Sequence, residues 1–483
     1  MENKKKNKKR PTALSAFTII LILTFILAII SHLLPKAAFS GDTIINGSGV
    51  VGATLSQTLL APILGFADAI DICLFVLVLG GFLKIINHTQ AIETGIQVLI
   101  KKLHGRELAL IPILMLLFSI GGTTYGMLEE TVGFYALLAA VMVASGMDTI
   151  VSSAIVLLGA GSGVLGSTIN PFAVGAAVSA LPEGTTVNQG IIIGLGVMLW
   201  LTTLIISIIF VTNYAKKVIA KKGSTFLSLQ EQKDMEETYG TKTGKKIEAE
   251  LSGKQKVTLW LFALTFVIMI IGFIPWEDFG VTFFSKTTGW LTGAPLGQWY
   301  FNEATLWFLI MSIVIGVINR LKEHDFVEIF IDGADDMVGV ILIIAIARGA
   351  SVLMKVTYLD NYIIINAAKV LQNVPAYVFA PMNYLLHVGL SILVPSSSGL
   401  ATLSTPIMGP LAGQVGFSVE ATIMEMVAAN GLVNLFTPTC GAIMGGLALA
   451  KVDYTTWLKW VGKVIFTIAI VNIIILTLAM IIL

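Results

Sequence analysis

This chain has few charged residues, few histidines and only two cysteines. Asp, Glu, Lys and Arg make up 12% of its 483 residues, about half the share found in soluble domains. Cys73 and Cys440 both lie in apolar runs, which excludes a secreted disulfide scaffold. The net charge is +1 and no basic patch lies outside the termini and loops, which argues against nucleic-acid binding. A large soluble catalytic domain is also excluded, because no polar stretch is longer than 216–256.

What the chain has instead is apolar sequence. Hydrophobic residues make up 56% of it and the mean hydropathy is +0.88, values that predict an all-α, multi-pass membrane protein. A helix that crosses a bilayer needs ~20 mostly apolar residues. Residues 1–13 form a basic tail ahead of the first apolar run, so we expect an uncleaved first helix and a cytoplasmic N-terminus. The predicted crossings are 14–34, 66–86, 148–180, 189–215, 257–274, 304–319, 337–354, 418–450 and 457–483.

Two further apolar stretches, 108–144 and 380–415, are interrupted in the middle by small and polar residues. We interpret them as re-entrant hairpins, which enter and leave the membrane on one side. Nine crossings then place 24 of the 30 Lys and Arg residues in cytoplasmic segments, as the positive-inside rule requires. The hydrophilic segment 216–256 becomes a solvated cytoplasmic linker between a first half, 14–215, and a second half, 257–483.

The two halves share a pattern of acids and bases. Segment 66–71 (FADAID) resembles 330–335 (FIDGAD), and each opens an apolar helix that ends in a lone base, Lys84 or Arg348. The matching positions are 264 residues apart. An odd number of crossings separates the partners, so they run in opposite directions, which is typical of transporters that work by alternating access. Acids at helix starts and bases at helix ends also suit the helix dipole, which favours a structural role for the acids. These are Asp68, Asp71, Asp332 and Asp335.

Each hairpin is interrupted at its predicted tip. Backbone that leaves a helix at membrane depth must face protein or a water-filled cavity, because lipid satisfies no N–H or C=O group. Gly121 and Gly122 allow a tight turn in the first hairpin. The second hairpin is expected to turn between Pro395 and Gly399, around a run of three serines.

Each half also contains one broken helix. Proline removes a hydrogen bond and frees a carbonyl four residues earlier, so Pro171 should open 148–180 and Pro438 should open 418–450. Two hairpin tips and two opened helices then meet near the middle of the membrane. Helix N-termini there favour a carboxylate, and the freed carbonyls and hydroxyls could ligate Na⁺. The candidates for that ion are Ser167, Asn170 and Thr437.

Two glutamates in the first hairpin, Glu129 and Glu130, have no acidic counterpart in the second. A glutamate in the first turn of a helix stabilises its N-terminus, whereas an ionisable group inside a membrane often marks a transport pathway, and both roles stay open. A carboxylate opposite anion-binding helix ends would suit a zwitterion or a basic amino acid. Glu420 and Glu425 are weaker candidates for the same role. The full predicted substrate-binding set is Thr123, Thr124, Glu129, Glu130, Ser167, Thr168, Asn170, Ser396, Ser397, Ser398, Asn430, Asn434, Thr437 and Thr439.

At these positions the chain resembles the C4-dicarboxylate anaerobic carrier family, and in particular its YfcC-like branch. The matching text is GGTTYGMLEET, GSTINPFAVGAAVSA, LVPSSSGLATLSTPIMGPLAG and NLFTPTCGAIMGGLALAKVDYTTWLKWVG, and the resemblance extends over the chain outside 216–256. It implies a protein of the bacterial cytoplasmic membrane with a scaffold, a mobile transport domain, an elevator mechanism and a homodimeric assembly. Relatives carry Ser-Asn-Thr at the hairpin tips, where this chain has Gly-Thr-Thr and Ser-Ser-Ser.

The breaks and the resemblance together predict a secondary transporter rather than an enzyme. Our first hypothesis is exchange of basic amino acids, since the resemblance includes arginine–ornithine exchangers. The alternative is a carrier of C4-dicarboxylates driven by Na⁺ or H⁺, and neither needs a cofactor beyond a coupling ion. An intramembrane hydrolase is a distant alternative, because the five histidines are scattered, no H-E-x-x-H occurs and only His387 lies in a hairpin near serines. A channel would need polar stripes along several helices, whereas the polar residues here cluster at one depth.

Overall fold

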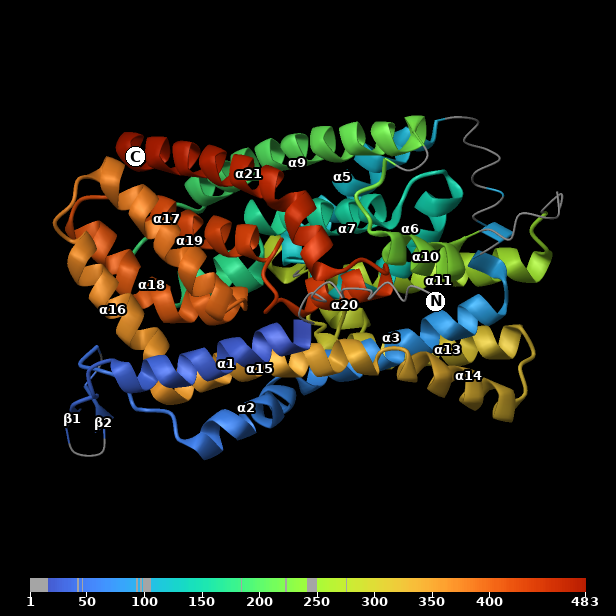
Figure 1. Cartoon of the computed structure of the whole chain (residues 1–483), viewed down its shortest axis with the longest axis horizontal. Helices are drawn as coiled ribbons and strands as arrows, with labels where there is room; N and C mark the ends of the chain where they lie inside the picture. The colour runs from blue at the N-terminus through green and yellow to red at the C-terminus, as the bar shows by residue number, and fades with distance from the viewer. Residues whose placement is uncertain are drawn as a thin grey trace, which may run out of the picture.

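The structure is a computed structural model, and it describes residues 16–40, 43–45, 47–92, 94–95, 98, 106–183, 185–221, 224–240, 250–274 and 276–483. The predicted basic tail, 1–13, lies outside these residues. Most helices run nearly along the long axis of the molecule (Figure 1). Within the described ranges the strands are two short ones, β1 (Phe39–Ser40) and β2 (Thr43–Ile44), which pair antiparallel.

Helices make up nearly all of the regular structure. Those of the first half are α1 (Ala16–Leu33), α2 (Leu55–Asp68), α3 (Ile70–His88), α5 (Leu110–Tyr125), α6 (Val132–Ala144), α7 (Thr149–Leu165), α8 (Ala176–Ser179) and α9 (Gln189–Ala220). The middle of the chain forms α10 (Leu229–Tyr239), α11 (Gly253–Phe273) and α12 (Phe283–Thr287). Those of the second half are α13 (Phe301–Ile318), α14 (Glu323–Asp335), α15 (Val338–Thr357), α16 (Leu359–Leu371), α17 (Ala376–Leu393), α18 (Ser397–Gln414), α19 (Val419–Val433), α20 (Gly441–Leu449) and α21 (Tyr454–Ile482).

Seven of the described helices are long and apolar enough to cross a membrane, and each is apolar over most of its length. They are α3, α5 with the short turn before it, α9, α11, α13, α17 and α21. Five of the nine predicted crossings are among them, whereas α5 and α17 belong to the stretches predicted as re-entrant hairpins. The predicted crossings 14–34 and 337–354 are not among the seven, and neither are 148–180 and 418–450. Each of the last two stretches is interrupted, so that no single helix in it reaches the required length.

The two broken helices form the centre of the molecule. Every residue of α7 is buried, and so is every residue of α19 from Ala421 onward. Helices α5 and α9 pack on α7, whereas α17, α18 and α21 pack on α19. Small residues permit this close packing: a Cβ on Gly431 of α19 would lie 2.3 Å from the Cα of Leu165 of α7. The apolar core is therefore continuous across both halves.

The two hairpins open toward opposite ends of the molecule. The arms α5 and α6 extend to the right from the centre of Figure 1, whereas α17 and α18 extend to the left. The first arm of each pair ends near the centre, at Tyr125 or Leu393, and the returning arm begins at Val132 or Ser397. Both tips thus lie beside the interruptions of α7 and α19.

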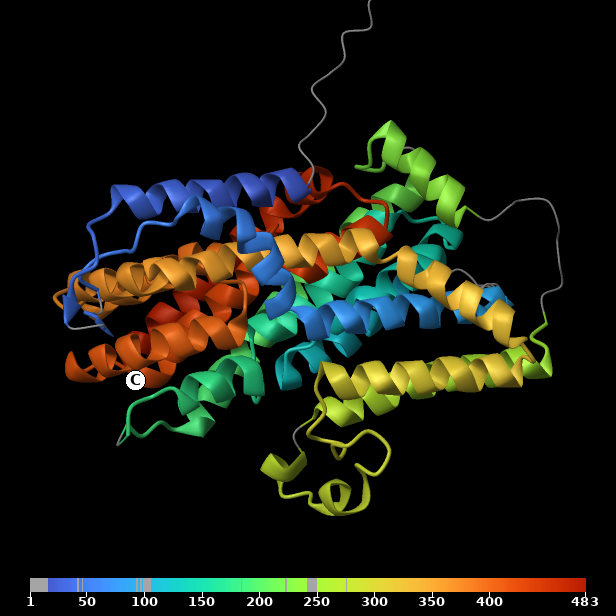
Figure 2. The same cartoon turned by 90° about the horizontal axis from the view of Figure 1, so that it is seen from below.

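The predicted single helices 66–86 and 337–354 are in fact the second members of kinked pairs. Helix α2 leads into α3 and α14 leads into α15; α2 lies along α15 and α3 along α14 (Figures 1 and 2). Glycines permit the backbones of these helices to approach closely. A Cβ on Gly65 would lie 2.2 Å from Ala345 O, and one on Gly80 would lie 2.3 Å from Gly333 O.

The helix starts in the two halves do not share one spacing. Helices α2 and α14 begin at residues 55 and 323, and α3 and α15 begin at 70 and 338, an offset of 268, whereas α5 and α17 begin at 110 and 376, an offset of 266. The predicted offset of 264 describes the pattern of acids and bases and not the starts of these helices. Because residues four positions apart lie on the same helix face, an alignment of acids and apolar residues can slip by one turn without a change of pattern.

The described part of the segment 216–256 includes a helix that is folded against the rest of the chain. Helix α9 continues to Ala220 and α11 already begins at Gly253. Between them, Glu231 of α10 is buried and accepts hydrogen bonds from the backbone N–H of Asp453 at 2.9 Å and from Thr456 Oγ1 at 3.1 Å. The prediction of a fully solvated connector is therefore wrong for α10, which docks on α21.

Candidate substrate site

One cavity of about 110 Å³ is lined by residues from all four interruptions. It lies where the two hairpin tips meet the broken helices, and α3, α15 and the start of α13 complete its wall. A smaller adjoining cavity shares part of this lining and reaches Thr439 and Cys440. The predicted residues that line the larger cavity are Glu129, Asn170, Ser396, Ser397, Ser398 and Asn434.

The first tip turns at Gly126 and not at Gly121 and Gly122, which lie inside α5. Gly126 has a φ of +82°, a left-handed conformation that side chains disfavour. A Cβ on it would also lie 2.7 Å from Asn170 Nδ2. Gly122 has a packing role instead, since a Cβ there would lie 2.1 Å from Ala160 O of α7. The sequence signal was a pair of glycines, but only tertiary contacts distinguish a turn from a close helix crossing.

Thr123 and Thr168 fasten the first tip to the first broken helix. Thr123 Oγ1 donates to Gly166 O at 2.7 Å, and the backbone N–H of Thr168 donates to Thr123 O at 2.9 Å. Both residues are buried. The hydroxyl of Thr124 donates to Ile120 O in its own helix at 2.7 Å. None of the three lines the cavity, so the structure places them behind its wall.

The opening of the first broken helix comes just before Pro171. Helix α7 ends at Leu165, and Pro171 begins a short wide turn, 171–175, that leads into α8. Asn170 caps this turn, because its Oδ1 accepts from the backbone N–H of Phe172 at 2.9 Å. Its Nδ2 donates to Ser167 Oγ at 2.9 Å. The side-chain oxygens of Ser167 and Asn170, which are predicted to ligate Na⁺, thus already accept hydrogen bonds.

The second tip presents a helix N-terminus to the cavity. The chain leaves α17 at Val394 and Pro395, and α18 begins at Ser397. Ser396 caps α18 by accepting from the backbone N–H of Gly399 at 3.2 Å, so Gly399 lies in the first turn and not in the break. The first N–H groups of a helix have no partner within it. Those of Ser397 and Ser398 therefore give this wall an anion-binding character.

Asn430 and Asn434 of the second broken helix hold this tip in place. Asn434 Nδ2 donates to Pro395 O at 3.0 Å, and Asn430 Nδ2 donates to the same oxygen at 3.2 Å. Ser397 Oγ donates to Asn430 Oδ1 at 2.8 Å. Asn434 Oδ1, by contrast, is buried without a partner among the described residues, on a side chain that lines the cavity. A buried acceptor of this kind is a candidate for a ligand that donates hydrogen bonds.

Thr437 and Thr439 surround Pro438 in the second opening. Their hydroxyl oxygens lie 2.7 Å apart, and Thr439 Oγ1 donates to Ile392 O at 2.7 Å, which ties the opening to the end of α17. Thr439 reaches the smaller cavity, whereas Thr437 is fully buried and lines neither. Thr439 thus fastens the second tip much as Thr123 fastens the first.

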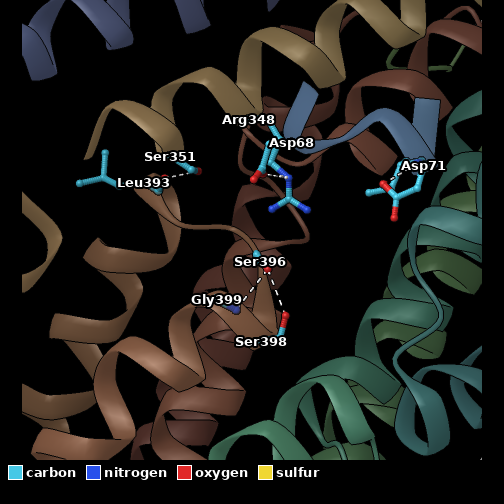
Figure 3. A network of polar contacts seen from close by, with 9 residues as sticks. Asp68, Asp71, Arg348, Ser351, Leu393, Ser396, Ser398 and Gly399 are labelled. Atoms are coloured by element: carbon cyan, nitrogen blue, oxygen red, sulfur yellow. Dashed lines mark hydrogen bonds and ion pairs between the residues drawn. The ribbon is translucent and has the colours of Figure 1, made fainter. Parts of the chain in front are cut away.

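Arg348 is the charged residue of the site that the sequence analysis did not select. It lies on α15, lines both cavities and points between α2 and the serines of the second tip (Figure 3). Its Nε lies 3.5 Å from Asp68 Oδ2. The signal was available, since a lone arginine in an apolar helix is costly and usually functional. It was interpreted only as a base at a helix end.

Glu129 lines both cavities together with that arginine, and it is half-buried. Helix α6 begins three residues later, at Val132. The side chain of Glu130 lies outside the described part of the chain. The lining of the cavity thus combines a carboxyl group, a guanidinium and a helix N-terminus.

The serine–histidine alternative finds no support in the geometry. His387 is fully buried, and its Nε2 lies 2.6 Å from Ser404 Oγ. Ser404 lies inside α18 and is not one of the three serines of the tip. Neither residue lines the cavity. Within the described residues no group of three or more His, Cys, Asp or Glu side chains is arranged to hold a metal ion.

Fold and site together define a class: a multi-pass membrane protein whose hairpin tips and broken helices enclose a polar cavity, as in secondary transporters. The chain belongs to the C4-dicarboxylate anaerobic carrier family, which matches residues 14–481. It is a secondary membrane transporter of this family and not an enzyme.

Relatives by sequence are an uncharacterised protein of Haemophilus influenzae and YfcC of Escherichia coli, which is provisionally assigned as a basic amino acid antiporter. The first is 31% identical over 85% of this chain and 76% of the relative. The second is 27% identical over 82% and 74%. Among solved structures, YdaH of Alcanivorax borkumensis aligns with a TM-score of 0.45 at 14% identity, covering 96% of this chain and 97% of YdaH. MtrF of Neisseria gonorrhoeae aligns with a TM-score of 0.39 at 16% identity, covering 98% and 96%.

Proposed function

We propose that this transporter carries a small amino acid, and that its reaction is the exchange of basic amino acids such as arginine and ornithine. The observation that carries the proposal is the placement of Arg348 and Glu129 in one cavity. The guanidinium of Arg348 and the first turn of α18 favour a carboxylate. Glu129 and the unpaired Asn434 Oδ1 favour an ammonium or guanidinium group, which an amino acid supplies in the same molecule.

We further propose that residues 14–215 and 257–483 are inverted repeats that move the cavity between the two aqueous faces as an elevator. The common offset of α2 and α3 from α14 and α15 supports this, as do hairpins that open toward opposite ends. In this proposal the protein is a homodimer in the bacterial cytoplasmic membrane. Its N-terminus faces the cytoplasm, since most Lys and Arg residues then lie inside.

A second candidate function is the transport of C4-dicarboxylates. The smaller cavity favours it, because Gly441 at the start of α20 lines that cavity together with Arg348. Two helix N-termini, those of α18 and α20, would then each receive one carboxylate. Glu129 opposes this function, since a carboxylate in the same cavity repels a dianion unless it is protonated.

Uptake into liposomes distinguishes the two functions. Vesicles with purified protein, preloaded with ornithine, should take up labelled arginine and release ornithine in return. Empty vesicles and vesicles that contain succinate serve as controls. If labelled succinate enters succinate-loaded vesicles while arginine does not enter ornithine-loaded ones, the dicarboxylate function is correct and the amino-acid proposal is wrong.

A further inference from the structure

A second buried polar group lies in the α17–α18–α19 bundle, away from the cavity. Glu425 of α19 is fully buried, and its Oε2 accepts a hydrogen bond from Asn383 Nδ2 of α17 at 2.6 Å. Neither residue lines the larger or the smaller cavity. The substrate site described above therefore does not account for a carboxyl group in the apolar core of the second half.

The remaining oxygens of this pair are both without a partner. Glu425 Oε1 and Asn383 Oδ1 are buried and accept no hydrogen bond from the described residues. An ionised carboxylate has only acceptors, and an amide oxygen is an acceptor too, so the ionised pair cannot satisfy both atoms. One proton on Glu425 changes this. A protonated Oε1 supplies a donor that Asn383 Oδ1 can accept, while Asn383 Nδ2 continues to donate to Oε2.

The helices around Glu425 offer no base that would neutralise it instead. On α17, His387 has Nδ1 2.8 Å from Asn383 O and Nε2 2.6 Å from Ser404 Oγ, and the hydroxyl of Tyr384 accepts from Asn472 of α21 at 3.2 Å. Helices α7 and α18 contain no titratable residue. The remaining titratable residues of α9, α17 and α21 are exposed or bonded elsewhere: Lys216, Lys217, Tyr214, Tyr377, Tyr454, Lys459 and Lys463.

We propose that Glu425 is a proton-binding site, and that the gain and loss of this proton couples transport to the proton gradient. The proposal rests on the function as a secondary transporter and adds the coupling ion. The proton binds Glu425 Oε1 from water and returns to water. No other bond forms or breaks. Ionisable groups buried inside a membrane often mark proton relays.

The position of Glu425 links the proton to the second hairpin tip. Helix α17 is one arm of that hairpin, and α19 holds its tip through Asn430, which bonds Ser397 and Pro395. With Glu425 protonated, α17 and α19 pack without an unpaired group between them. Loss of the proton leaves two unpaired acceptors there, so water must enter and the hairpin loosens from α19. The proton thereby favours the second hairpin tip held on α19 by Asn430.

The first test needs no substrate. Glu425→Gln keeps both hydrogen bonds, because the amide donates to Asn383 Oδ1 and accepts from Asn383 Nδ2, so this variant should fold. Infrared difference spectra of wild type and variant at neutral pH should contain one protonated-carboxyl band that belongs to Glu425. Glu420→Gln, at the start of the same helix, is the matched control and should retain the band. Absence of such a band in the wild type would overturn the proposal.

The second test measures coupling in liposomes with the membrane potential clamped at zero. In ornithine-loaded vesicles, with one proton coupled to each exchange, an inward gradient of about one pH unit supports up to about tenfold more accumulation of labelled arginine than the same wild-type vesicles reach without the gradient. Glu425→Gln should show no added accumulation with the gradient but retain arginine–ornithine exchange. Equal accumulation by both proteins, or wild-type uptake that follows Na⁺ and ignores pH, would contradict the proposal. If only succinate is carried, the same assay is run with succinate; the substrate proposal then fails, and the proton site is still tested.

Discussion

Lys84 Nζ lies 2.8 Å from Asp336 Oδ2, and this ion pair joins the first half of the chain to the second. In the corresponding contact the base, Arg348, lies in the second half and the acid, Asp68, lies in the first. Lys84 of α3 thus contacts the acid just before α15, and Arg348 of α15 contacts the acid just before α3. The environments differ, because Arg348 lines both cavities whereas Lys84 lines neither. Of the two bases, Arg348 is therefore the one that a substrate in the cavity can reach.

This difference makes Lys84 the natural control for Arg348. Arg348→Gln should weaken binding of a substrate carboxylate by about 10- to 100-fold, because a hydrogen bond to a charged group contributes about 1.5–3 kcal/mol. Lys84→Gln should leave binding unchanged. The shift in melting temperature on addition of arginine or succinate measures both. Equal effects of the two substitutions would remove Arg348 from the site.

Glu129 separates the two candidate functions. If the substrate is a basic amino acid, Glu129→Gln should raise its KM by about tenfold or more, since the variant loses a charge partner of the ammonium or guanidinium group. If the substrate is a dicarboxylate, the same substitution removes a repulsive charge and should lower KM. Uptake of labelled arginine and labelled succinate by the variant gives the sign directly. A KM unchanged for both substrates would show that Glu129 does not contact substrate.

Ser398 and Thr124 test which hydroxyls the substrate meets. Ser398 lines the cavity, and its Oγ lies 3.4 Å from Ser396 Oγ. Thr124 donates to its own helix and lies behind the wall. Ser398→Ala should weaken substrate binding by about fivefold, the equivalent of about 1 kcal/mol, and Thr124→Ala should have no effect on it. Titration calorimetry with the transported substrate compares them, and the reverse order of effects would contradict the assignment of the wall.

The elements of the site could be predicted from the sequence, because the breaks have a local cause. Pro171, Pro395 and Pro438 remove helix hydrogen bonds inside apolar runs, and the structure has an interruption at each of them. The second hairpin, 380–415, follows from the same signal, whereas the first turns at Gly126 without a proline. Proline alone does not decide the break, since Pro62, Pro381, Pro406 and Pro410 lie inside continuous helices.

The orientation of side chains could not be predicted in this way. The hydroxyls of Thr123 and Thr168 face each other because α5 crosses α7 closely, a contact between residues far apart in the sequence. Arg348 reaches the cavity only because α15 lies along α2. These placements depend on helix packing, and neither composition nor spacing encodes it.

Gly126 is expected to be irreplaceable at the first tip, and Gly146 is its control. Both glycines have a left-handed conformation, with φ of +82° and +78°, but a Cβ on Gly146 would meet nothing within 4 Å. Gly146→Ala should lower the free energy of unfolding by about 1–2 kcal/mol, the cost of a left-handed conformation for a residue with a side chain. Gly126→Ala should cost this plus the displacement of Asn170, a further ~1–3 kcal/mol. Melting temperatures without ligand measure both, and equal losses would mean that Asn170 does not press on the tip.

The crossing of α2 and α15 leads to a prediction in which two Gly→Ala substitutions change the stability of the protein in opposite directions. A Cβ on Gly349 would lie 2.5 Å from Ala61 O, so Gly349→Ala forces α15 away from α2 and should cost about 1–3 kcal/mol. Gly389 lies inside α17, and a Cβ there would meet nothing within 4 Å. Gly389→Ala should stabilise the protein by up to about 1 kcal/mol, because alanine is more favourable than glycine in the interior of a helix. Since Arg348 precedes Gly349, we also expect Gly349→Ala to weaken substrate binding, whereas Gly389→Ala should not. Melting temperatures with and without substrate test both effects, and a stabilised Gly349→Ala protein would show that this crossing is not tight.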